Sequence, residues 1–140
     1  MPVERIRRII ELKEKLMEDK QREISDILLL IDRLINNINS IEANINSNYD
    51  YITTNTLNGS DLCLIKENII YLENKKFNLT EEKDECNKRL SFLRMELVEQ
   101  AREIKKLETL KLKTIQAIKK AKNRKEQKFL DDIALKSIKD

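Results

Sequence analysis

The sequence predicts an all-α protein, a long two-helix antiparallel coiled-coil hairpin with a C-terminal helical overhang. Two long stretches carry apolar residues at alternating steps of three and four, and the two stretches pair in one constant register. The midpoint of that register falls at the only glycine. Composition agrees, because one Gly and one Pro in 140 residues are too few turn residues for a multi-stranded sheet. A chain with 38% charged residues can still form long helices, which need only an apolar stripe.

The first predicted helix covers about residues 3–53. Pro2 suits its first turn, where a missing N–H leaves no hydrogen bond unmade. Lys13, Lys20 and Asn48 interrupt its apolar seam. The seam consists of Val3, Ile6, Ile10, Met17, Ile24, Ile27, Ile31, Leu34, Ile38, Ile41, Ile45 and Ile52.

The second predicted helix covers about residues 61–138. Lys76, Lys83 and Gln100 interrupt its seam. The stretch Asn78–Glu81 also matches a helix start with a capping-box glutamate, so a bend or break near residues 74–80 is an alternative. The seam consists of Leu62, Ile65, Ile69, Leu72, Leu79, Cys86, Leu90, Leu93, Leu97, Ile104 and Leu107.

Facing positions of the two seams have residue numbers that add to 117, as for Ile24 with Leu93. This register places the reversal between Asn58 and Gly59, inside a turn of about residues 54–60, and makes residues 1–140 a single coiled-coil hairpin. An Asn-Gly pair suggests a positive φ at the glycine, and Ser60 or Asp61 is expected to cap the second helix. The register ends near Thr114, beyond which the second helix continues without a partner.

Several functional classes are excluded. Without histidine there is no His base and no Cys-His zinc site, and one glycine cannot form a phosphate-binding loop. Carboxylates on an extended coiled coil lack a pocket that would perturb their pKa. We therefore predict no enzyme activity, no catalytic residue, no metal site and no cofactor. Cys63 and Cys86, 23 positions apart, fit no metal pattern and are expected to be reduced structural thiols.

Targeting and membrane signals are also weak. The longest apolar run is the five residues 27–31, far too short for a signal-peptide core or a membrane span. The expectation is a cytoplasmic protein without membrane insertion.

The sharpest charge feature is the segment 111–128, which has eight basic residues and one acidic residue and coincides with the overhang. At helical spacing the basic side chains surround the helix. They suit an anionic partner such as an acidic protein lumen, nucleic acid or lipid head groups, or else form a solvated face that favours the helix dipole. Nucleic acid is the less favoured partner, because no aromatic residues are interleaved. The basic residues are Lys111, Lys113, Lys119, Lys120, Lys122, Arg124, Lys125 and Lys128.

Two further surfaces could bind proteins. Tyr49, Tyr51, Tyr71 and Phe77 cluster near the predicted turn, where residues 36–60 hold eight Asn and only two charges. These aromatics either bind a protein or cover the end of the seam. Some apolar residues lie off the seam, so the apolar face is wide or a partner covers it, self-association being the simplest case. They are Ile9, Leu12, Leu16, Leu28, Leu30, Ile35, Phe92 and Val98.

Residues 102–111 (REIKKLETLK) and 124–134 (RKEQKFLDDIA) resemble the C-terminal part of FliJ, a family of flagellar export-apparatus stalk proteins. That family typically shows a Lys-x-Leu-Glu-x-Leu-Lys stretch, followed by a Glu-Gln-Lys-x-x-Asp-Glu block. The Tyr71-Leu72 pair and the charged opening ELKEKLMEDK are also similar to the family. The sequence departs from the family at Asp132, which replaces the usual Glu, and in lacking the common N-terminal aromatic. These two departures leave open the alternative of a stalk protein from a virulence-type secretion system.

The resemblance implies an antiparallel coiled coil similar to the γ-subunit stalk of rotary ATP synthases, at the cytoplasmic face of the inner membrane. It implies that the end with both termini engages a hexameric export ATPase, that the tip contacts an export-gate membrane protein, and that export chaperones are further partners. The gate-binding candidates are Tyr49, Tyr51 and Tyr71. Together with the charge pattern, the resemblance makes the ATPase-binding candidates Arg5, Arg7, Arg8, Lys119, Lys120, Lys122, Arg124, Lys125, Gln127 and Lys128.

Two alternative functions remain. The basic overhang could make the chain a helical nucleic-acid-binding protein. Exposed apolar and tip residues could instead make it a prefoldin-like holdase chaperone.

Overall fold

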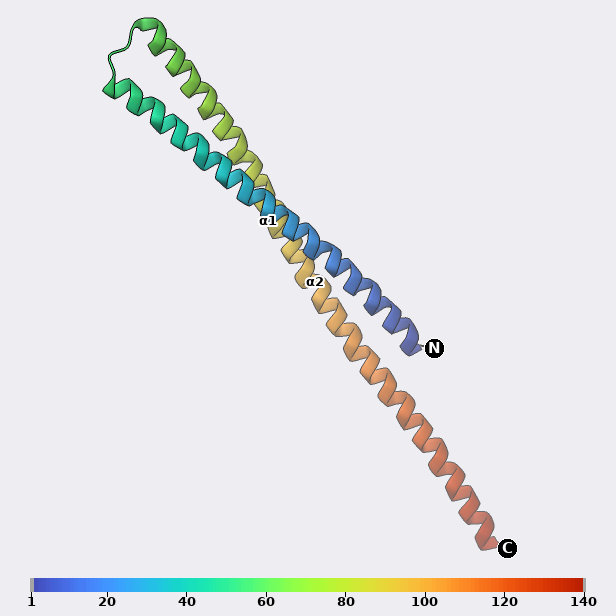
Figure 1. Ribbon diagram of the computed structural model, residues 1–140. Helices are drawn as coiled ribbons and strands as arrows, with labels where there is room; N and C mark the ends of the chain where they lie inside the picture. The colour runs from blue at the N-terminus through green and yellow to red at the C-terminus, as the bar shows by residue number, and fades with distance from the viewer. Residues whose placement is uncertain (1, 140) are drawn as a thin grey trace. The chain divides into compact units, whose positions relative to one another are not determined.

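A computed structural model describes residues 2–139 as two long helices packed against each other, α1 (Pro2–Thr54) and α2 (Gly59–Lys139) (Figure 1). No strand occurs in this range, which confirms the all-α hairpin. The helix ends differ from the predicted ones by one or two residues.

The second helix is continuous through residues 74–80, so the alternative of a break there is wrong. The hydroxyl of Thr80 donates to the Lys76 carbonyl at 2.8 Å, as it would inside any helix. The capping-box pattern loses here because the apolar seam continues on both sides of it and favours one helix.

The structure divides into two compact units, and each contains part of α1 and part of α2. The loop unit comprises Lys20–Glu96, and the terminal unit comprises Met1–Asp19 with Leu97–Asp140. The two units are described separately.

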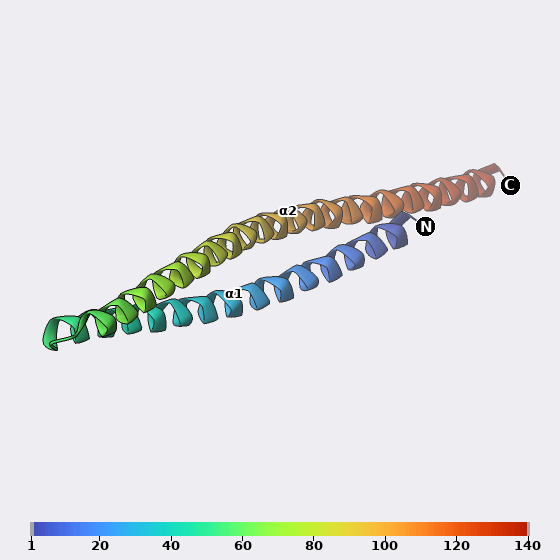
Figure 2. The same cartoon turned by 90° about the horizontal axis from the view of Figure 1, so that it is seen from above.

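In the loop unit, α1 and α2 lie side by side from the connecting loop onward (Figures 1 and 2). Every predicted seam position in this unit is buried or half-buried. Leu93 is the most deeply buried side chain, with 1% of its surface exposed. Near the loop, Ile41, Ile45 and Ile69 form one buried cluster. The heptad stripe is thus the core of the unit, and its burial is the main favourable term in folding.

Lysines that interrupt the seam reach carboxylates on the other helix. Lys20 donates to Glu96, and Lys76 lies 3.0 Å from Glu42. Their aliphatic stems cover the seam while the ammonium groups stay at its edge. The interruptions therefore leave no unpaired charge inside the core at these two positions, although such half-exposed pairs add little stability.

Side-chain hydrogen bonds to backbone carbonyls reinforce the end of α1. The hydroxyls of Thr53 and Thr54 donate to the carbonyl of Asp50 at 3.0 and 2.7 Å. The side-chain amide of Asn55 donates to the carbonyl of Tyr51 at 3.1 Å. The Tyr51 carbonyl also accepts the backbone N–H of Asn55 at 3.1 Å, so the side-chain bonds reinforce the last turn rather than replace its backbone bonds.

The start of α2 corrects two predictions. The side-chain oxygen of Asn58 accepts the N–H of Asp61 at 2.8 Å, so Asn58 is the N-cap rather than Ser60 or Asp61. Gly59 is the first residue of α2 and does not have a positive φ. The positive φ was wrong because the chain reverses through the loop 55–58 and not through a tight Asn-Gly turn.

Candidate functional site

The paired part of the terminal unit has a small core. Ile6, Ile10 and Ile104 are buried together. At its edge, the ammonium group of Lys13 donates to a carboxylate oxygen of Glu103 at 2.5 Å. This hydrogen bond, with the charge of Lys13, lowers the pKa of Glu103 below its usual value. The first part of α1 is thus held against α2 by one short apolar layer with a charged edge.

Beyond this layer, α2 continues without a partner helix. Every side chain described from residue 115 to residue 138 is exposed. The register explains the limit, because Pro2, the first residue of α1, faces position 115. The predicted overhang is confirmed.

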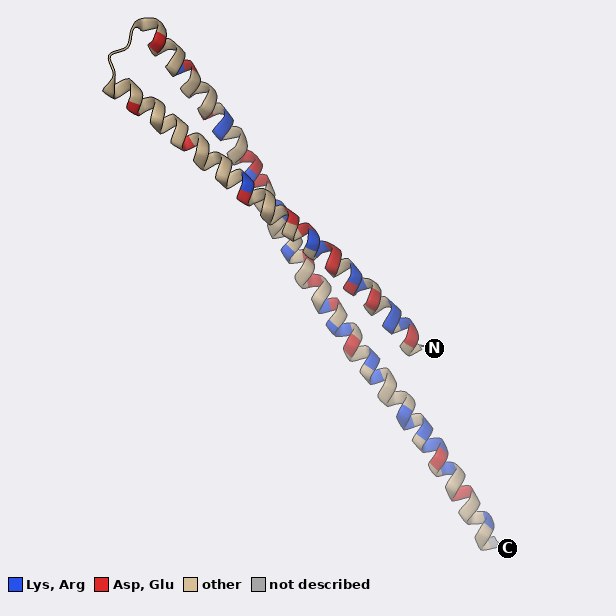
Figure 3. Cartoon of the chain, in the orientation of Figure 1, with Lys and Arg blue, Asp and Glu red and all other residues tan. Residues whose placement is uncertain are grey.

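The overhang carries its basic side chains on all sides. At 3.6 residues per turn, Lys119, Lys120, Lys122 and Lys125 point in four different directions, and Arg124 shares the face of Lys120. Figure 3 shows Lys and Arg recurring along this part of α2. A further candidate, Gln127, donates to a carboxylate oxygen of Asp131 at 3.1 Å and is therefore already engaged within the helix.

The opening candidates Arg5, Arg7 and Arg8 lie in the same unit, on the paired part of α1. All three are exposed, and none forms an ion pair within the described chain. The structure therefore places the two sets of ATPase-binding candidates one after the other along the terminal unit. Over residues 2–19 and 97–139 the unit has 18 basic and 11 acidic residues, whereas the loop unit has 10 and 13.

The tyrosine candidates lie in the loop unit on two helices, and all three remain exposed. Tyr49 and Tyr51 are on α1 with about half of their surface exposed, and Tyr71 is on α2 with 61% exposed. Few charges surround the loop (Figure 3). Side chains this exposed do not seal the end of the seam. Residues 2–139 leave about half or more of each tyrosine's surface uncovered, where a partner could contact it.

The comparison with protein families decides the identity. A sequence model of the family described as "Flagellar FliJ protein" matches residues 2–139, nearly the whole chain. The chain belongs to the FliJ family. No curated protein and no solved structure matches it.

Membership makes the chain a component of the flagellar protein-export apparatus, in a family of structural components that are not known enzymes. The described helices include none that is both long and apolar enough to cross a bilayer. Among residues 2–139, no group of three or more metal-ligating side chains comes together.

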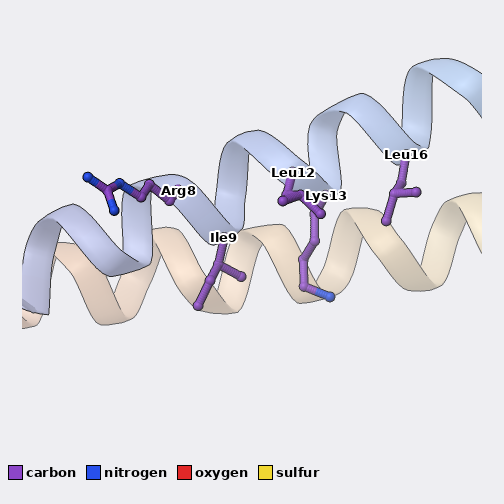
Figure 4. A pocket seen from close by; sticks show the side chains of 5 residues that line it. All are labelled: Arg8, Ile9, Leu12, Lys13 and Leu16. Atoms are coloured by element: carbon purple, nitrogen blue, oxygen red, sulfur yellow. The ribbon is translucent and has the colours of Figure 1, made fainter.

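One surface was only partly anticipated. Ile9, Leu12 and Leu16 stood out in the sequence as apolar residues off the seam. The structure shows that they line a shallow groove of about 260 Å³ together with Arg8 and Lys13 (Figure 4). The apolar spacing places the three residues on one face of α1, and the structure adds that this face is left partly uncovered.

Proposed function

We propose that this FliJ-family chain is a non-enzymatic stalk that links the hexameric export ATPase to the export gate at the cytoplasmic face of the inner membrane. The observation that carries the proposal is the unpartnered basic helix of the terminal unit. A helix that is rich in basic side chains and has no partner helix is suited to bind an acidic surface of another protein.

The charge pattern suits a partner that approaches from several directions. Because Lys119, Lys120, Lys122 and Lys125 point to different sides of the helix, no single flat surface can contact all of them. An acidic lumen within a ring would contact them all. Basic side chains at that position would draw the ring subunits together by neutralising acidic groups on each of them.

A second role, contact with the export gate, belongs to the loop unit. Tyr49, Tyr51 and Tyr71 are exposed beside an Asn-rich surface with few charges. Aromatic side chains with little surrounding charge are typical of protein-binding hot spots. They support contact with the export gate. Export chaperones are further partners in this proposal.

The ATPase arm is tested by replacing Lys119, Lys120, Lys122 and Arg124 with Ala. Alanine is a strong helix former, so circular dichroism should remain unchanged. Binding to the purified export ATPase should weaken by about tenfold or more, since several charge contacts are lost together. A matched control replaces four exposed basic residues of the loop unit, Lys66, Lys75, Lys88 and Arg94, and should bind normally. Equal binding by both variants would remove this role from the overhang.

The gate arm is tested by the triple replacement Tyr49→Ala, Tyr51→Ala and Tyr71→Ala, with Phe92→Ala, 51% exposed and outside the aromatic cluster, as the control. Only the triple variant should lose binding to the cytoplasmic part of the export gate. The nucleic-acid alternative would instead be supported by DNA or RNA binding that falls steeply with salt. Suppressed aggregation of unrelated clients would support the holdase alternative.

A further inference from the structure

A second apolar stripe runs along α1 in the terminal unit, on a different face from the seam. Ile9, Leu12 and Leu16 recur at steps of three and four and are 40%, 65% and 43% exposed. Figure 4 shows them in sequence along the groove, with Arg8 at the end nearer the N-terminus. The seam on this stretch is formed instead by Ile6 and Ile10, which are buried against α2. The stripe is therefore an apolar surface that the rest of its unit covers only in part, and least at Leu12.

The charges at the two ends of the stripe are opposite. The same steps of three and four extend it to Arg5 on one side and to Asp19 on the other. Neither residue forms an ion pair within residues 2–139. Lys13, which lines the groove, is already neutralised by Glu103. The stripe thus has a basic end, three apolar side chains and an acidic end. Two copies of it that run in opposite directions are complementary in charge.

We propose that a second copy of this chain docks on the stripe, with the two α1 helices antiparallel and a two-fold axis beside Leu12. In this arrangement Leu12 contacts Leu12 of the other copy, and Ile9 lies beside its Leu16, one residue or about 1.5 Å from the directly opposite position. Arg5 and Asp19 face each other across the axis, once at each end. A parallel pair would set Arg5 against Arg5, so charge favours the antiparallel pair. Such a two-fold contact is the commonest form of self-association.

The contact has a regulatory consequence that rests on the proposed function. Arg5 and Arg8 are ATPase-binding candidates, and both lie at the docked surface. The dimer and the ATPase complex would therefore exclude each other. The dimer itself is tested without the ATPase, so its failure and the failure of the stalk proposal are distinguishable.

Sedimentation velocity of the full chain over a concentration series gives the first test. Three apolar side chains per copy form a small contact, so we expect reversible dimers with a dissociation constant of about 10–100 μM. Leu12→Asp should raise that constant by about tenfold or more, because it places two carboxylates at the axis. The matched control is Leu112→Asp, whose side chain is similarly exposed at 61% and lies outside the stripe. A monomer at all concentrations, or equal effects of the two variants, would overturn the proposal.

Charge reversal tests the pairing. Arg5→Asp or Asp19→Arg alone places like charges opposite each other and should weaken the dimer by about tenfold. The double variant restores opposite charges and should return to within about threefold of the parent chain. A double variant that is weaker than both single variants would exclude the antiparallel contact. It would leave the groove to an acidic helix of another protein.

Crosslinking tests the axis. In a background with Cys63→Ser and Cys86→Ala, Leu12→Cys should form an intermolecular disulfide under mild oxidation, since only residues near the axis approach their own copy. Ile9→Cys alone should not link, but it should link when mixed with Leu16→Cys. Self-linking of Ile9→Cys in place of Leu12→Cys would contradict the arrangement.

Discussion

The loop unit and the terminal unit share one heptad pattern but differ in how many side chains they bury and in their charge. The loop unit contains most of the buried side chains, whereas the terminal unit buries only Ile6, Ile10 and Ile104. Acidic residues outnumber basic ones in the loop unit, and the terminal unit has the opposite balance. In the loop unit the apolar stripe finds a partner along its whole length. In the terminal unit α2 outlasts α1, and its exposed basic surface stays open to other molecules.

This difference has a consequence for local stability. Segments with few buried apolar contacts open with little free energy, and binding segments are often drawn from them. Every described side chain of the overhang from residue 115 to residue 138 is exposed, so its order depends mainly on the helix itself and on what binds it. The loop unit should hold the hairpin together while the terminal unit meets its partners.

The largest effect is expected for Ile31→Asp in the loop unit. Ile31 is 8% exposed and faces Cys86 in the register, so the new carboxylate would be buried without a partner. We expect a loss of about 3 kcal/mol or more in the free energy of unfolding. Urea denaturation followed by circular dichroism measures it. The control is Leu29→Asp, at 59% exposure, which should change little. Equal stability of Ile31→Asp and the parent chain would contradict the register.

Alanine at a core position of each unit compares the two cores directly. Leu93→Ala should cost about 2–4 kcal/mol, because the closely packed loop unit cannot collapse into the cavity. Ile104→Ala should cost less, since the terminal unit is open on more sides and can relax. Denaturant midpoints of both variants, with Met95→Ala (72% exposed) as a surface control, give the ranking. A larger loss for Ile104→Ala would reverse the assignment of the stable unit.

The cap of α2 gives a smaller effect with a built-in control of opposite sign. Asn58→Ala removes the acceptor for the Asp61 N–H and should cost about 1 kcal/mol. Gly59→Ala should stabilise by about 0.5–1 kcal/mol, because a Cβ at this helical position meets nothing within 4 Å. Thermal melting of both variants tests the corrected turn. Destabilisation by Gly59→Ala would restore the Asn-Gly turn that the sequence suggested.

The smallest effect concerns the ion pair of the terminal unit. The pKa of Glu103 is lowered by Lys13, so the folded state favours the ionised carboxylate. That stabilisation is present above the ordinary pKa of the group and is lost as the pH falls through its lowered pKa. Lys13→Gln should therefore melt slightly below the parent chain at pH 7, with the difference vanishing once acid has protonated Glu103. A difference that persists in acid would mean that Lys13 acts through packing alone.

Much of this structure follows from the order of residues along two paired helices, and that part was predictable from the sequence. Two apolar seams with a constant register predicted the pairing of α1 with α2, the place of the reversal and the start of the overhang. Lys20 and Lys76 were recognisable as interruptions of the seam. Their partners Glu96 and Glu42 were not, because the reach and direction of a long side chain depend on its neighbours.

The order of apolar and charged residues determined the fold class, because heptad spacing leaves a helix one way to bury its stripe. It also determined which residues of α2 lie beyond the register, since the pairing ends where α1 begins. Tertiary structure decided the conformation of the loop and its cap at Asn58, where several turns satisfy the same residues. It also decided that off-seam side chains such as Leu12 stay exposed, because that depends on how much of each helix its partner covers.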